Sequence, residues 1–247
     1  MVLCRIFLFS LFIMFSASAL AQEKVNIHQT LIWYGGSITR QFENGNAVGL
    51  KIERRDFTFP GRKQQLVLPN IYASKKLSNH WKLDVGIWIF TIYQPGNQAF
   101  PVRNKQYEWR PYFTLDYKQP VKRGFLNVAV KSEYRGFNAA GVESHFEGAF
   151  ETYVVRERFL VRYTYPITSN LAARAGEELL LNVAGNRGLG TFDQNRLMTD
   201  MVYSLEFKGS KDQLKLHAGY LHWYQPTGII NTYFSHHIIT TGVDFVF

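Results

Sequence analysis

The sequence has almost no cysteine, because Cys4 is the only one among its 247 residues. Cys4 lies within the first apolar stretch of the chain, before the charged and aromatic segments begin. A disulfide needs two cysteines, and cysteine-based zinc sites need several. These totals exclude a cross-linked scaffold and a cysteine-based metal site, and we expect no cofactor.

Beyond its first residues, the sequence also lacks any apolar run long enough for a transmembrane helix. The stretch "MVLCRIFLFSLFIMFSASALAQEK" has a basic Arg5, an apolar run and an Ala-Leu-Ala motif before Gln22. These features are typical of a secretory signal peptide with its cleavage site. A membrane anchor is the alternative, although the apolar run falls short of the ~20 residues that span a bilayer. We predict a signal peptide over residues 1–21 and one domain over residues 22–247, exported by the general secretory route.

Helical patterns and long basic runs are absent as well. No segment places apolar residues at positions i, i+3 and i+4 between helix-capping residues, and no Pro/Ser-rich linker divides the chain. The net charge is +9, yet no run of Lys or Arg exceeds two residues. Because an exported chain without a basic block is a poor match for nucleic acid, we expect no nucleic-acid partner.

What the sequence does contain is a series of segments rich in aromatic and β-branched residues, separated by polar breaks. Such segments are typical of β-strands. Eleven can be counted, at 29–40, 46–56, 64–75, 80–93, 105–118, 124–137, 150–165, 170–183, 194–207, 212–224 and 233–247. Because single-chain bacterial membrane barrels have an even number of strands, we predict twelve strands, and ten stays open.

Within the segments, apolar and polar residues alternate. In "YEWRPYFTLDYK", Trp109 and Phe113 share one face, and Glu108 and Asp116 share the other. The same alternation recurs in residues 194–207. Because successive side chains of a strand point to opposite faces, each strand is expected to have one apolar face and one face with charges of both signs.

Three features favour lipid against the apolar face. The segments are longer than the roughly 5–6 residues usual in soluble sheets. Short connections such as 166–170 alternate with longer ones such as 137–148, as in outer-membrane barrels. The last segment ends in Phe247, which resembles the signal read by the bacterial barrel-assembly machinery.

These features predict an all-β fold, a transmembrane antiparallel up-and-down β-barrel with short periplasmic turns and longer extracellular loops. Its place would be the bacterial outer membrane, in contact with outer-membrane lipid, because only a closed barrel leaves no sheet edge in hydrocarbon. A soluble secreted β-barrel with its apolar face inside is the alternative.

The charged face would then line the lumen. It carries Lys51, Glu53, Arg55, Lys82, Asp84, Glu108, Arg110, Asp116, Lys118, Lys131, Glu133, Arg135, Arg156, Arg158, Arg162, Arg174, Glu178, Arg196 and Asp200. These side chains can form an ion-pair network that plugs the barrel. Alternatively they line a narrow pathway or site for a small anionic solute, because arginine binds carboxylate and phosphate through paired hydrogen bonds. The candidate anion-binding residues are Arg110, Arg135, Arg156, Arg158, Arg162, Glu178, Arg196 and Asp200.

An enzyme, lipase-like in kind, is a third possibility. The candidate groups are histidines and their neighbours: Glu143, His145, Glu147, Ser235, His236 and His237. Adjacent histidines on a strand point to opposite faces and make a poor metal clamp. Because no nucleophile, base and orienting group can be recognised together, we expect no catalytic residue and no bound metal.

Several segments spread over most of the chain resemble a known family. They are "QTLIWYGG", "YEWRPYF", "VKSEYR", "RERFLVRY", "GEELLLN", "FDQNRL" and "HAGYL". The chain resembles the uncharacterised outer-membrane proteins grouped as domain of unknown function 2490, in which an Arg-rich pair of strands, a Glu-x-x-x-Asn strand and an Asp-Gln-Asn-Arg entry recur. Arg156, Arg158 and Arg162 match the second strand of the Arg-rich pair. Glu178 and Asn182 match the second pattern, and Asp193 to Arg196 match the third. The resemblance implies a barrel in the outer membrane and implies no activity.

Overall fold

The computed structural model describes residues 24–58, 63–93, 105–138, 144, 150–207, 209–227 and 229–247. The predicted signal peptide and the candidates Glu143, His145 and Glu147 lie outside the described residues. Within the described part, no helix is long and apolar enough to cross a membrane. The strands are β1 (Val25–Gln41), β2 (Ala47–Phe57), β3 (Lys63–Lys76), β4 (Trp81–Tyr93), β5 (Lys105–Val121), β6 (Gly124–Asn138), β7 (Phe150–Pro166), β8 (Leu171–Gly185), β9 (Phe192–Glu206), β10 (Gln213–Pro226) and β11 (Thr232–Val246).

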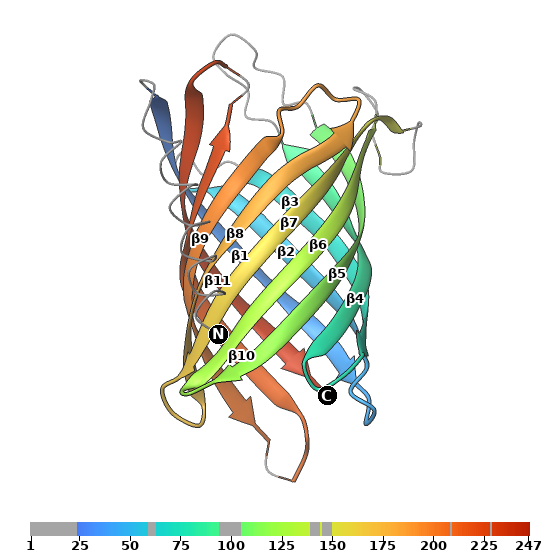
Figure 1. Cartoon of the computed structure of the whole chain (residues 1–247), viewed down its shortest axis with the longest axis vertical. Helices are drawn as coiled ribbons and strands as arrows, with labels where there is room; N and C mark the ends of the chain where they lie inside the picture. The colour runs from blue at the N-terminus through green and yellow to red at the C-terminus, as the bar shows by residue number, and fades with distance from the viewer. Residues whose placement is uncertain are drawn as a thin grey trace, which may run out of the picture.

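The strands form one closed barrel, as predicted (Figure 1). Each strand pairs with the next along the chain in antiparallel fashion, and β1 pairs with β11 to close the sheet. We call the end with the β1–β2, β3–β4, β5–β6, β7–β8 and β9–β10 connections the short-turn end. The other end, which holds the connections at 94–104 and 139–149, is called the long-loop end.

The number of strands in the described residues is eleven and not the predicted twelve. An even number would put both chain ends at the same end of the barrel. Here β1 begins at the long-loop end and β11 finishes at the short-turn end, so these two strands run parallel. Their register is continuous from Val25 opposite Thr232 to Thr39 opposite Val246. The eleven segments visible in the sequence are therefore the strands themselves, and the parity argument added one in error.

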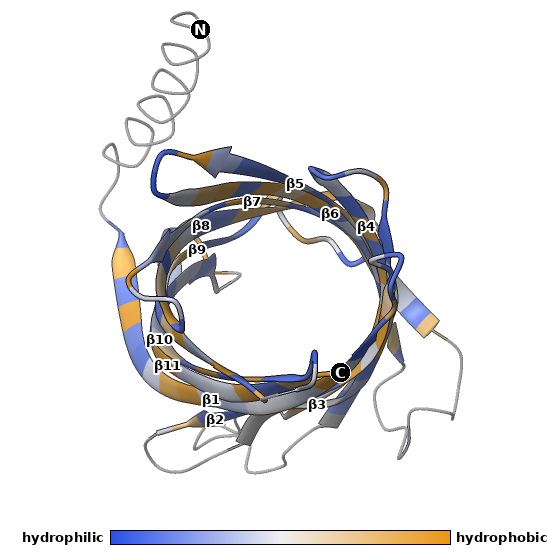
Figure 2. Ribbon diagram, turned by 90° about the horizontal axis from the view of Figure 1, so that it is seen from below, coloured by the Kyte–Doolittle hydropathy of each residue, from blue (hydrophilic) through white to orange (hydrophobic). Residues whose placement is uncertain are grey.

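Alternation along each strand decides which side chains face in and which face out. Along β9, Leu197, Met201 and Tyr203 are exposed on the outer surface, whereas Arg196, next to Leu197, is buried. Figure 2 shows the same alternation as orange and blue bands along the strands around the ring. The space inside the ribbon ring is occupied by inward-pointing side chains.

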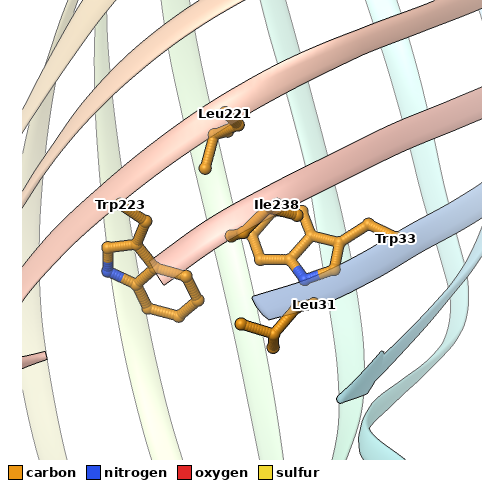
Figure 3. Close-up of a cluster of buried hydrophobic side chains, with 5 residues drawn as sticks. All are labelled: Leu31, Trp33, Leu221, Trp223 and Ile238. Atoms are coloured by element: carbon orange, nitrogen blue, oxygen red, sulfur yellow. The ribbon is translucent and has the colours of Figure 1, made fainter. Parts of the chain in front are cut away.

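Part of that interior is apolar. Leu31 and Trp33 on β1, Leu221 and Trp223 on β10, and Ile238 on β11 form a buried cluster (Figure 3). The register explains their contact, because Leu31 and Leu221 both lie opposite Ile238. The two indole rings meet edge to face with centroids 5.6 Å apart, a favoured arrangement for aromatic pairs. This apolar cluster faces inward and fills one side of the lumen.

Candidate functional site

The inward faces of β5 to β9 bring charged side chains together in two neighbouring sets of ion pairs, one around Glu108 and one around Glu133 and Glu178. We call the two sets together the belt, and its members are Glu108, Arg110, Lys131, Glu133, Arg135, Arg156, Arg158, Glu178, Asp193 and Arg196. Alternation places these residues on the lumen side of their strands. Strand register then decides which of them touch.

Glu133 is the centre of the belt. It lies directly opposite Arg156 in the β6–β7 ladder. One carboxylate oxygen accepts a hydrogen bond from Arg156 Nε at 2.9 Å, and the other accepts one from Arg158 Nη1 at 2.8 Å. Lys131 Nζ lies 3.2 Å from the same carboxylate. Three cations therefore share one buried acid.

Glu108, on β5, is a second carboxylate that binds two cations of the belt. Glu108 lies 2.7 Å from Arg110 and 2.8 Å from Arg135, so it joins a neighbour on its own strand to one on β6. Arg135 donates to both carboxylate oxygens, which is the paired geometry that makes arginine–carboxylate contacts strong.

The β8 and β9 strands complete the belt. Glu178 accepts hydrogen bonds from Arg158 at 2.6 Å and from Arg196 at 3.2 Å. Arg156, already bound to the central acid, also donates to Asp193 at 2.7 Å. Arg156 and Arg158 thus act as bridges, each joining carboxylates from two different strands.

Aromatic rings pack against the guanidinium groups at the edges of the belt. The contacts, given as the distance from guanidinium carbon to ring centroid, are Arg55 over Trp33 at 3.8 Å, Arg110 over Phe90 at 4.0 Å and Arg196 over Trp223 at 5.0 Å. Cations over aromatic faces are stabilised by the ring quadrupole. Because Trp223 belongs to the apolar cluster and lies opposite Arg196 in the β9–β10 ladder, the belt and that cluster meet between these two strands.

Three members of the belt are almost completely buried. Glu108 is 0% exposed, and Glu133 and Arg156 are each 1% exposed. A side chain lining a water-filled channel keeps contact with water, so these values indicate packed side chains at this level of the barrel. Buried charges are tolerated only when they are paired and hydrogen-bonded, and the belt meets that condition.

The lumen toward the short-turn end is more polar and more open. Arg174 forms a two-pronged ion pair with Asp200 there, and their side chains remain about a quarter exposed, at 26% and 24%. Ser37 donates to Asp244, which is 34% exposed. The side chains of this half of the interior are therefore more accessible than Glu108, Glu133 and Arg156.

All eight predicted site residues face the lumen. Six of them belong to the belt: Arg110, Arg135, Arg156, Arg158, Glu178 and Arg196. Asp200 pairs with Arg174 below the belt. Arg162 differs from the others, because no described side chain of opposite charge lies within 4 Å of it and its Nε atom has no hydrogen-bond partner.

Reasoning from sequence missed the inward aromatic residues. Trp33, Phe90 and Trp223 were not among the residues assigned to the lumen from the sequence. Their position in the two-residue alternation of each strand could have identified them. Trp33, for example, shares its face with Gly35 and Ser37 and not with the outward-facing Tyr34.

The candidate catalytic residues on β11 point in different directions. His236 is buried inside the barrel against Trp223, with ring centroids 4.9 Å apart. His237 faces outward, where its ring lies 5.3 Å from that of His222. Ser235 Oγ is 2.9 Å from His222 Nε2, but Ser235 is only 5% exposed. The pair therefore presents no accessible nucleophile.

The fold and the belt together define a closed all-β barrel with an apolar exterior and a packed, charged interior. The chain belongs to the family described as protein of unknown function DUF2490, whose family model matches residues 30–233. Neither the curated proteins nor the solved structures include a significant match. The family supplies no activity, so a functional proposal has to come from the geometry.

Proposed function

We propose that this protein is an integral β-barrel of the bacterial outer membrane, with a lumen closed by the belt. In this proposal the barrel serves as a structural membrane body and does not act as an open pore. The single observation that carries the closure is the near-complete burial of Glu108, Glu133 and Arg156 in the middle of the interior.

The outer surface supports a membrane location. Ile52, Phe113 and Leu197, from different parts of the ring, are each at least half exposed, at 56%, 51% and 50%. Soluble monomers rarely expose large continuous apolar patches. Here apolar side chains alternate outward along strand after strand, and lipid is the solvent that matches such a surface.

The few outward carboxylates have local partners. Ser132 Oγ donates to Glu157 at 2.7 Å, and Asn195 Nδ2 donates to Glu177 at 2.8 Å. A hydrogen-bonded carboxylate costs less next to hydrocarbon than a bare one. These contacts make the outward acids compatible with a lipid-facing wall.

A narrow pathway for a small anionic solute is the second candidate, because cations outnumber carboxylates in the belt. Arg110, Lys131, Arg135, Arg156, Arg158 and Arg196 face Glu108, Glu133, Glu178 and Asp193. An anion would have to displace one of these carboxylates to pass. The pathway therefore requires the belt to open.

Electrical conductance separates the two candidates. We expect the folded full chain to give no current steps in planar lipid bilayers. A variant with Glu133→Ala and Arg156→Ala together removes one acid and one base from the belt, and it should produce steps. The matched control replaces Lys82 and Asp84 by alanine. These two residues form an ion pair outside the belt with a 2.9 Å contact, and this variant should give no current steps. Current steps from the unmodified protein would contradict closure and support the pathway.

Membrane location needs a separate test. Expressed with its N-terminal segment in a Gram-negative host, the protein should sediment with outer-membrane vesicles and resist extraction by alkaline carbonate. Recovery in the soluble periplasmic fraction would favour the secreted soluble barrel instead.

A further inference from the structure

Three buried polar atoms without hydrogen-bond partners lie together below the belt. They are Asn127 Oδ1, Arg162 Nε and Thr164 Oγ1. Asn127 and Thr164 are 6% and 5% exposed, and Arg162 is half-buried. Buried polar groups in native proteins are almost always satisfied. Three unsatisfied atoms in one place indicate that something outside the chain belongs there.

Strand register brings these atoms together. Asn127 lies directly opposite Arg162 in the β6–β7 ladder, and Thr164 is the next inward residue along β7. On the other side, Arg162 lies opposite Gly176. A Cβ atom at Gly176 would stand only 3.0 Å from Arg162 Cβ, so the glycine leaves room for the arginine side chain. The three polar side chains therefore share one lumen-facing patch.

An acid without a cation borders the same patch. Asn127 Nδ2 donates to Asp116 Oδ1 at 3.1 Å, which turns the free Oδ1 of Asn127 away from that contact. No described cation lies within 4 Å of Asp116. Arg162 and Asp116 are close enough to interact electrostatically but do not touch. Neighbouring inward positions therefore present one cation, Arg162, and two acceptors, Asp116 and Asn127 Oδ1.

We infer that this patch is a binding site for a small zwitterion of the α-amino carboxylate class. Arg162 and Thr164 would donate to the carboxylate of the ligand. Asp116 and Asn127 Oδ1 would accept hydrogen bonds from its ammonium group. The inference rests on the proposed closed lumen, since the ligand then enters and leaves only through the short-turn end, where Arg174 and Asp200 are partly exposed.

The charge balance favours a zwitterion over a simple anion. An anion at Arg162 would also meet Asp116, which repels it, while the neighbouring Arg174 is already neutralised by Asp200. A ligand carrying both charges satisfies the cation and the acid at once. Burying a charge is favourable only when it is paired, and one zwitterion pairs both.

The experiment is calorimetric titration of the folded full chain in detergent with three small probes. L-Alanine carries both charges, propionate lacks the ammonium group, and ethylamine lacks the carboxylate. We expect saturable binding of L-alanine and at least tenfold weaker binding of the other two. Arg162→Gln and Asp116→Asn should each weaken L-alanine binding at least tenfold. Lys51→Ala, which removes a lumen cation on β2 that is bound to Glu53, should leave it unchanged.

Each alternative gives a distinct result. If ordered water alone fills the patch, the unmodified protein will show no saturable L-alanine binding. If propionate bound as tightly as L-alanine, the ligand would be a simple anion and not a zwitterion. If Arg162→Gln did not weaken L-alanine binding, the L-alanine site would lie elsewhere in the protein. Each of these overturns the inference. The shift in gel mobility on heating checks that every variant is folded. Conductance is measured independently, so an open lumen with intact L-alanine binding would refute closure alone.

Discussion

Glu133 and Arg156 face each other directly across the β6–β7 ladder, and each is 1% exposed. The acid also binds Arg158, and Arg156 also binds Asp193. One cross-strand pair therefore links strands β6, β7 and β9 through the middle of the barrel. Removing either member leaves charges that are buried and cannot reach water.

Glu133→Gln is predicted to destabilise the barrel strongly. Glutamine keeps the size of the side chain but removes the charge that balances Arg156, Arg158 and Lys131. Breaking a buried ion pair costs about 3–5 kcal/mol because the remaining charge stays buried. Urea unfolding of the protein in detergent, followed by tryptophan fluorescence, should show a loss of this size in the free energy of unfolding.

Asp200→Asn is the control for that measurement. It removes the acid from another lumen ion pair, but Arg174 and Asp200 are both about a quarter exposed. Water can solvate the arginine that remains, so the loss should be close to the ~1 kcal/mol of an exposed pair. Equal losses in the free energy of unfolding for Glu133→Gln and Asp200→Asn would mean that water reaches the belt.

Much of this interior could be predicted from alternation alone. All eight site residues named from the sequence face the lumen, because a period of two decides the face of each residue once the outer face is known. The pairing could not be predicted in this way. Arg158 and Arg162 lie on the same face of β7, yet only Arg158 reaches Glu178, while Arg162 lies opposite Gly176. That difference depends on register between strands, which a single sequence does not contain.

A closed barrel was predicted, but the parallel pairing that closes it was not. Eleven segments were visible in the sequence, and twelve strands were predicted because the rule of even numbers assumes that both chain ends lie at one end of the barrel. That assumption does not hold here, because β1 and β11 pair in parallel. Likewise, Trp33 and Trp223 were not among the residues assigned to the lumen from the sequence. Here they pack under Arg55 and Arg196.

Quenching by lipid is predicted to reduce the fluorescence of outward-facing tryptophans more than that of inward-facing ones. Trp81 lies on the outer surface and is 41% exposed, whereas Trp33 and Trp223 lie in the apolar cluster inside. In vesicles of brominated phospholipid, a variant that keeps only Trp81 should lose most of its fluorescence. A variant that keeps only Trp223 should lose little.

Phenylalanine replaces the other tryptophans in both variants, so overall composition is matched. The comparison depends on which solvent touches the outer wall. If the Trp81 signal stays unquenched while the protein is folded, lipid does not cover that face, and the soluble secreted barrel becomes the better description.

Phe247 is predicted to act mainly in assembly. Its backbone completes the β1–β11 seam, where Phe247 N donates to Thr39 O at 3.0 Å and Gln41 N donates to Phe247 O at 2.7 Å. Its ring only stacks on Phe245, with centroids 5.8 Å apart, and Arg40 lies over it. Phe247→Ala keeps the backbone contacts and removes the ring. We therefore expect refolding in detergent to be nearly unchanged, because the ring adds little to the fold.

In cells the same substitution should lower the amount of folded barrel in the outer membrane several-fold, because the proposed assembly signal is the terminal aromatic ring. Phe247→Tyr keeps an aromatic ring and should restore normal levels. Quantitative gels of heated and unheated outer-membrane fractions measure the folded share. Equal folded levels for Phe247→Ala and the unmodified protein would show that the ring plays no part in recognition. A parallel loss on refolding in detergent would instead assign the ring a role in stability.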